Sequence, residues 1–123
     1  MKNFGKELIL DIHNCDVSTF TRESIKKYCR KLCKLIDMVA CEFHFWDFEE
    51  DPQGYEQAED HIKGISAIQF ITTSNITIHT LDKLERVYIN IFSCKNFDGI
   101  TAREFTETWF HGQIVNAKVI ERI

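Results

Sequence analysis

Three strand-like segments follow one another closely in the middle of this chain, at residues 65–72, 76–80 and 86–93. Isoleucine recurs in each of them, and only a few mostly polar residues separate one segment from the next. Links this short favour antiparallel neighbours, because a parallel crossover needs a dozen or more residues. We therefore expect the centre of the chain to form an antiparallel sheet.

Helical periodicity marks two further segments, residues 20–37 and 101–110. In the first, apolar residues recur at helical spacing while lysines and arginines fall mostly on the opposite side, which is the usual pattern of a solvated face. Asp16 or Ser18 is the candidate cap of this helix. Three more strands are expected, at residues 7–12, 39–46 and 114–120.

The order of these elements predicts an α+β fold. Strands bracket two helices without a repeating β-α-β-α alternation, which favours a two-layer sandwich: a mostly antiparallel sheet with both helices packed on one face. With 123 residues and 44% hydrophobic residues the chain can bury one core, so residues 1–123 are expected to form a single domain. An acidic stretch, residues 49–60, contains the only proline and is typical of a surface loop or a short helix inserted between two strands.

Composition argues against several classes of protein. The net charge of −4, with basic residues scattered among acids, gives no electrostatic footprint for nucleic acid. No apolar run reaches the roughly 20 residues of a membrane-spanning helix and the start of the chain lacks a signal-peptide core, so we expect a cytoplasmic protein with no membrane partner. Five cysteines, at positions 15, 29, 33, 41 and 94, lack paired metal-ligand spacing, so free thiols and no metal site are expected.

The polar link between the first two strand-like segments, Thr72-Thr73-Ser74-Asn75, is the candidate functional motif. It is followed by His79, and a thiol, Cys94, comes just after the third segment. Each residue also has a purely structural interpretation: Ser74 as a turn residue, His79 as a strand residue and Cys94 as a small buried hydrophobe. Together with Ser66 they combine hydroxyl, imidazole and thiol groups, a set that fits proton-transfer chemistry.

Several short motifs recur in the same order as in a known protein family. They are Gly5-Lys6-Glu7-Leu8, Cys15-Asp16, Gly64-Ile65-Ser66, Ser74, Ile76-Thr77-Ile78-His79-Thr80 and Phe92-Ser93-Cys94. On these motifs the chain resembles the bacterial and archaeal S-adenosylmethionine decarboxylase proenzymes, which depend on a pyruvoyl group. The similarity extends over nearly the whole chain, and the combined spacing of Ser66, Ser74, His79 and Cys94 is its most specific part.

The resemblance implies that the chain cleaves itself between Thr73 and Ser74. The products are a β chain of residues 1–73 and an α chain of residues 74–123 that begins with a pyruvoyl group, a cofactor made from Ser74. Such a group is an electrophilic ketoamide. It forms when the serine hydroxyl attacks the preceding carbonyl and elimination breaks the resulting ester.

The resemblance also implies a role for each of the other motif residues. In the family, the residue matching His79 removes the serine α-proton during processing, and the residue matching Ser66 assists the acyl shift. The substrate amine forms a Schiff base with the pyruvoyl group. After carbon dioxide has left, the residue matching Cys94 reprotonates the product carbon.

Strand geometry adds an expectation about assembly. An extended strand rises about 3.3 Å per residue, so five steps would separate Ser74 from His79 by about 16 Å. Either the backbone folds back near Asn75, or His79 serves the Ser74 of a second subunit. The resemblance favours the second arrangement, with Ser74 and Cys94 from one protomer and Ser66 and His79 from the other. It thus implies a homodimer with shared active sites, in which two sheets form a larger sandwich.

The residues expected to bind the substrate depart in part from the family. There, an aromatic residue after the second strand stacks on adenine; Trp46 takes that position here, although a core tryptophan is the alternative. The family also has an acidic residue four positions after the histidine, where this chain has Lys83, which cannot accept hydrogen bonds from ribose hydroxyls. Asp82 and Glu85 flank Lys83 and are the candidate replacements. The insertion between Trp46 and Gly64 either covers the site or is inert surface.

Three functions remain open at this point. The first is decarboxylation of S-adenosylmethionine, which supplies aminopropyl groups for spermidine synthesis. The second is the same pyruvoyl chemistry on another amino acid, ornithine or arginine, and it is motivated by Lys83 and the insertion. The third is an unprocessed, non-catalytic homologue that binds a ligand or another subunit.

Overall fold

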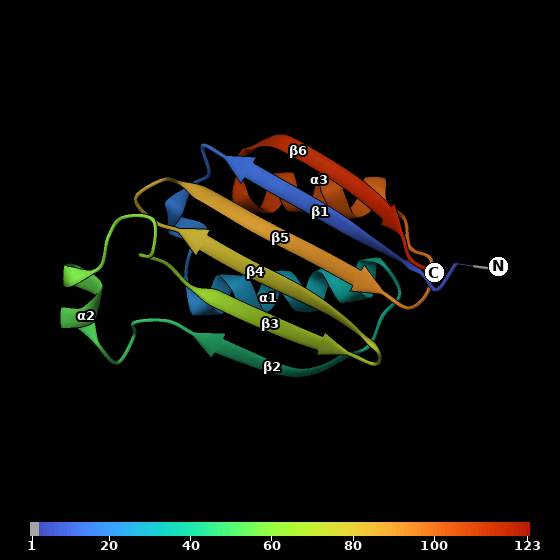
Figure 1. Ribbon diagram of the computed structural model, residues 1–123, viewed down its shortest axis with the longest axis horizontal. Helices are drawn as coiled ribbons and strands as arrows, with labels where there is room; N and C mark the ends of the chain where they lie inside the picture. The colour runs from blue at the N-terminus through green and yellow to red at the C-terminus, as the bar shows by residue number, and fades with distance from the viewer. Residues whose placement is uncertain (1–2) are drawn as a thin grey trace.

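The computed structural model describes residues 3–123 and forms two layers, a sheet and a pair of helices behind it (Figure 1). The strands are β1 (Lys6–His13), β2 (Ala40–Trp46), β3 (Ser66–Ile71), β4 (Ser74–Leu81), β5 (Arg86–Ser93) and β6 (Gln113–Glu121). They form one six-stranded sheet in the order β2-β3-β4-β5-β1-β6, and all neighbouring strands are antiparallel. The predicted α+β sandwich is confirmed.

Helices α1 (Arg22–Leu35) and α3 (Gly99–Phe110) lie side by side on one face of the sheet, as predicted (Figure 1). The buried hydroxyls of Tyr28 on α1 and Thr106 on α3 are 2.7 Å apart. A third helix, α2 (Pro52–Gln57), projects from the end of the sheet between β2 and β3, inside the predicted loop or short helix. None of the helices within residues 3–123 is both long and apolar enough to cross a membrane.

The start of α1 differs from the prediction. Thr21, and not Asp16 or Ser18, caps the helix, because its side chain accepts a hydrogen bond from the Ser24 N–H at 3.1 Å. Asp16 instead caps a separate 3-10 turn, η1 (Val17–Thr19), by accepting from the Ser18 N–H at 2.9 Å. The sequence offered several capping residues in a row, and only the tertiary path selects among them.

The core lies between the sheet and the two long helices. Strand β5 shows the alternation: Val87, Ile89 and Ile91 are fully buried toward the helices, while the residues between them are partly exposed on the other face. No element within residues 3–123 covers that other face, which is turned to the viewer in Figure 1. We call it the open face; it exposes large apolar side chains such as Ile68 and Phe70.

Strand β4 begins two residues earlier than predicted. Ser74 pairs with Ile71 of β3, so only Thr72 and Thr73 remain as the hairpin turn. Asn75 pairs with neighbours on both sides, and the strand continues without interruption to Leu81. The backbone therefore does not fold back near Asn75, which removes one of the two arrangements considered for Ser74 and His79.

Candidate active site

Ser66, His79 and Trp46 meet at one end of the open face. The antiparallel register places Trp46 beside Ser66 and Ser66 beside His79, so the three residues form a row across β2, β3 and β4. The Ser66 Oγ lies 2.8 Å from the His79 Nδ1. Trp46 is 71% exposed, so it is not a core tryptophan, and it lines a pocket of about 300 Å³ together with Ser66 and His79.

Ser74 and Cys94 form a second cluster, next to the β3–β4 turn. Ser74 is buried, and its Oγ accepts a hydrogen bond from the Cys94 N–H at 3.0 Å. The Cys94 thiol donates to the Thr72 carbonyl at 3.8 Å. A pocket of about 250 Å³ opens beside these groups, and Met38 and Val39 line it.

The surroundings of Cys94 favour its thiolate form. Hydrogen bonds from the hydroxyls of Thr73 and, secondarily, Ser74 lower the pKa of the thiol, and the nearby charge of Lys95 contributes in the same direction. A thiol with a lowered pKa is the stronger proton donor. By contrast, burial raises the pKa of Cys15 and Cys33 to about 11, so those thiols remain protonated and inert.

Within one chain the two clusters stay apart. Ser74 belongs to the side of β4 that carries the buried residues Ile76 and Ile78, whereas His79 is exposed on the open face. They also lie toward opposite ends of the strand, about 16 Å apart at the usual rise of an extended chain. The fold therefore brings Ser66, His79 and Trp46 together and Ser74 and Cys94 together, but not these two groups.

The peptide bond between Thr73 and Ser74, which is the bond expected to break, lies in a strained turn. Thr73 has φ +49°, a left-handed conformation that β-branched residues rarely adopt. Such a backbone state costs on the order of 1–3 kcal/mol and persists only where the surrounding structure enforces it. Here the pairing of β3 with β4 on both sides of a two-residue turn enforces it.

The two acids expected to replace the family's acidic residue lie elsewhere. Asp82 accepts a hydrogen bond from the Tyr55 hydroxyl at 2.8 Å and lines a different pocket of about 280 Å³ beside Arg22. Glu85 is exposed in the β4–β5 turn. Neither acid, nor Lys83, lines the pocket that contains Trp46 and His79.

Sequence reasoning missed two residues of that pocket, His61 and Ile62. They come from the end of the insertion and line the pocket beside Trp46. The insertion has no periodic pattern, so its sequence gives no signal for where this end would lie. Among residues 3–123 no group of three or more His, Cys, Asp or Glu side chains could hold a metal ion.

Comparison with known proteins identifies a family for this chain. A family model described as S-adenosylmethionine decarboxylase matches residues 6–123. The chain belongs to the S-adenosylmethionine decarboxylase family. Its fold is similar to a crystal structure of the adenosylmethionine decarboxylase from Aquifex aeolicus VF5, with a TM-score of 0.76 and 18% identity over 99% of this chain and 92% of that one. No curated protein sequence matches the chain.

Membership of the family confirms the resemblance noted in the sequence. The family match spans both clusters, from β1 to the end of β6. At 18% identity, the structural likeness shows the shared fold alone. The roles of Ser66, Ser74, His79 and Cys94 within the family fold remain predictions.

Proposed function

We propose that the chain is a self-processing, pyruvoyl-dependent decarboxylase of S-adenosylmethionine that serves spermidine biosynthesis. Cleavage between Thr73 and Ser74 yields residues 1–73 and 74–123. One observation carries the proposal: a serine hydroxyl held at a strained turn, with a preformed Ser66–His79 pair on the open face of the same β3–β4 hairpin. The proposal keeps the cytoplasmic location and the absence of a nucleic-acid partner expected from the sequence.

The residues around Ser74 fit a pyruvoyl group formed in place. Ser74 directly follows the left-handed Thr73, whose carbonyl is the target of the serine hydroxyl. The Cys94 N–H holds that hydroxyl by a hydrogen bond, and Met38 and Val39 line the adjoining pocket. A pyruvoyl group supplies an electrophilic ketone that binds the substrate amine and accepts the electron pair left by carbon dioxide.

Three side chains move or hold protons in this proposal. The Ser66 hydroxyl, 2.8 Å from the His79 Nδ1, orients the imidazole. His79 then accepts the α-proton of Ser74 when the ester breaks, because a neutral imidazole is a base near pH 7. In turnover, the Cys94 thiol delivers a proton to the product carbon, and its lowered pKa suits it to this step.

The separation of the clusters supports a homodimer with shared sites. A second chain that packs its open face on the first can bring its His79 to the β3–β4 turn next to the first chain's Ser74, whose side chain lies on the buried side of β4. The open face exposes Ile68 at 37% and Phe70 at 44%, and apolar side chains grouped on a surface mark interfaces. The larger sandwich implied by the family resemblance has this geometry.

Intact mass spectrometry tests the processing step. We expect the purified protein to yield two fragments that break between Thr73 and Ser74, with the second blocked to amino-terminal sequencing. Ser74→Ala is expected to remain a folded single chain without activity, because the loss of one buried hydrogen-bonding hydroxyl costs about 1–3 kcal/mol, less than the stability of a typical domain. A single full-length mass for the wild type after prolonged incubation would favour the non-catalytic homologue.

The substrate is tested by the release of labelled carbon dioxide. We expect release from S-adenosylmethionine and not from ornithine or arginine. A specific observation keeps the alternative substrates open: neither Asp82 nor Glu85 lies in the pocket with Trp46. Release only from ornithine or arginine would keep the pyruvoyl chemistry and reject the nucleoside substrate.

A further inference from the structure

We propose that the insertion supplies a substrate-recognition residue: His61 accepts a hydrogen bond from a sugar hydroxyl of the substrate. This inference rests on the proposed function and names the group that recognises the nucleoside half. It assigns to His61 the contact with ribose hydroxyls that an acidic residue at the position of Lys83 is expected to make. The geometry that supports it is the anchoring of the insertion at three points.

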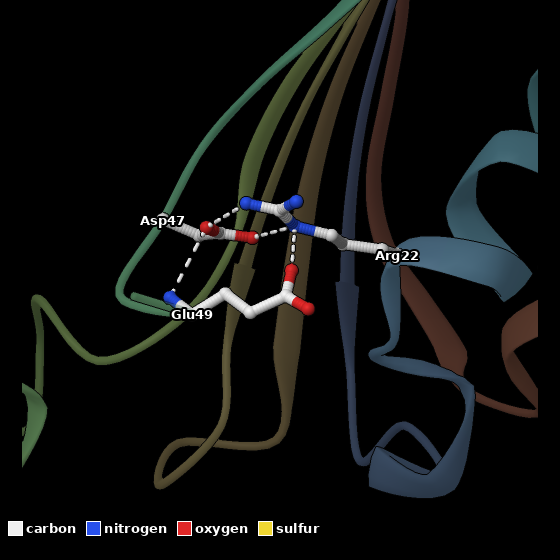
Figure 2. Close-up of polar contacts among 3 residues, drawn as sticks. All are labelled: Arg22, Asp47 and Glu49. Carbon is white, nitrogen blue, oxygen red and sulfur yellow. Dashed lines mark hydrogen bonds and ion pairs between the residues drawn. The ribbon is translucent and has the colours of Figure 1, made fainter. Parts of the chain in front are cut away.

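Arg22, the first residue of α1, fixes the start of the insertion (Figure 2). Its Nε and Nη2 donate to the two carboxylate oxygens of Asp47 at 2.8 and 2.7 Å, and it also pairs with Glu49. The Asp47 side chain is 5% exposed and the Arg22 side chain 42%, so the carboxylate depends on these two hydrogen bonds while the guanidinium still meets water. A fork of this kind fixes both distance and orientation.

Tyr55, Lys63 and Asp82 fix the rest of the insertion. The Tyr55 hydroxyl donates to Asp82, and burial together with that hydrogen bond raises the pKa of Tyr55 to about 12, which keeps it a donor. The Lys63 ammonium lies 5.2 Å from the centre of the Tyr55 ring. The Lys63 carbonyl accepts from the Asp82 N–H at 2.9 Å, which ties the insertion to the end of β4.

Gly64 completes this attachment. A Cβ at Gly64 would lie only 1.6 Å from the Thr80 carbonyl oxygen, so the backbone can approach β4 this closely only with glycine. The chain therefore returns to the sheet at a fixed point. His61 and Ile62 precede that point and line the pocket with Trp46 and His79.

The chemistry of His61 suits a hydroxyl donor. A neutral imidazole has one ring nitrogen with a free lone pair, so His61 can accept a hydrogen bond from a hydroxyl; the Glu59 carboxylate lies 3.4 Å from its Nδ1. Ribose hydroxyls need such an acceptor, whereas an ammonium group has none to offer. With Trp46 as a flat surface for a purine, the pocket offers one contact for a base and one for a sugar. Ornithine and arginine have neither group.

The test is a double-mutant cycle between the His61 side chain and the sugar hydroxyls of the ligand. Binding is measured by calorimetry on the purified protein. The probes are 5′-deoxy-5′-methylthioadenosine, which lacks the reactive amine, and its 2′,3′-dideoxy analogue. For the wild type, we expect loss of the hydroxyls to weaken binding roughly 5- to 10-fold, as for one hydrogen bond. For His61→Ala, the intact nucleoside should bind more weakly by a similar factor, and the dideoxy analogue should lose nothing further.

Two variants control the experiment. His61→Gln keeps an acceptor and is expected to recover part of the lost affinity. His13→Ala removes a histidine outside this pocket and is expected to bind like the wild type. Independent, additive losses from His61→Ala and from the dideoxy analogue would overturn the role of His61 while leaving the proposed function intact. If the wild type binds neither nucleoside and releases carbon dioxide only from ornithine or arginine, both the inference and the nucleoside substrate fail.

Discussion

Thr73 is a single residue whose backbone conformation can be tested apart from its chemistry. In a Ser74→Ala background, which should stay uncleaved, Thr73→Asn is expected to stabilise the chain by about 1 kcal/mol, because asparagine tolerates the left-handed region. Urea unfolding measures this difference. Thr72→Asn is the matched control, since Thr72 in the same turn does not share the positive φ. Equal effects of the two substitutions would show that Thr73 stores no strain.

Cys94 allows a second test at the scale of one residue. Because hydroxyl donors lower its pKa, the Cys94 thiolate should appear at a lower pH than the thiolate of an ordinary exposed cysteine. Alkylation by iodoacetamide, followed by mass spectrometry across pH, measures this on uncleaved His79→Ala chains that also carry Cys41→Ser, since Cys41 is exposed too. Thr73→Val, which removes the first donor, is expected to raise the midpoint. An unchanged midpoint would show that the Thr73 hydroxyl does not lower the pKa of Cys94.

At the scale of elements, strand positions followed from sequence more readily than strand ends. Isoleucine at alternating positions marks β4, but Ser74 and Asn75 resemble a turn because both are polar. In the structure both residues belong to the strand, because each pairs with β3 and the pairing satisfies their backbone groups inside the sheet. A single sequence does not contain that pairing. The same limit explains the wrong cap for α1.

Register also explains which parts of the site were predictable. Ser66 and His79 are 13 positions apart, yet one tight hairpin brings them opposite each other, so motif spacing alone was informative. His61 reaches the same pocket only through the Arg22 side-chain anchor at the start of the insertion and the Lys63–Asp82 backbone hydrogen bond at its end. Such contacts depend on α1 and β4, which are distant in sequence, and no local pattern encodes them.

The anchor between α1 and the insertion gives a prediction at this scale. Arg22→Ala is expected to lower the free energy of unfolding at pH 7, because it leaves the Asp47 carboxylate, whose side chain is 5% exposed, without its two hydrogen bonds from the guanidinium. Hydrogen bonds from Arg22 lower the pKa of Asp47, so the contribution is present above the unfolded value near 4 and is lost as the pH falls through the lowered one.

Urea unfolding of the wild type and of Arg22→Ala, at pH 7 and in acid, measures this contribution. The gap between the two proteins should narrow in acid. Lys27→Ala breaks an exposed pair with Glu23 on the same helix and is expected to change stability by less than about 0.5 kcal/mol. If the difference in free energy of unfolding between the wild type and Arg22→Ala does not change with pH, the Asp47 pair is not its cause.

For the whole molecule, the proposed shared site predicts which chain is cut in a mixed dimer. Chains carrying Ser74→Ala and chains carrying His79→Ala should each remain uncleaved alone. In a co-expressed heterodimer, one site combines an intact Ser74 with an intact His79 from the other chain. We therefore expect cleavage of the His79→Ala chain only, read by mass spectrometry. No cleavage in a verified heterodimer would place both residues of one site in the same chain.

The two-residue turn has a further consequence for a chain cut there. Strands β3 and β4 would remain joined at six paired positions, and β1 of the first fragment would stay clamped between β5 and β6 of the second. Nothing covalent would then reunite the fragments after unfolding, so recovery would become a bimolecular encounter that dilution slows. In such a chain folding would come before the cut, and unfolding after the cut would be reversed only slowly at low concentration. The lifetime of the mature protein would thus be set by the rate at which its fragments separate rather than by a reversible balance.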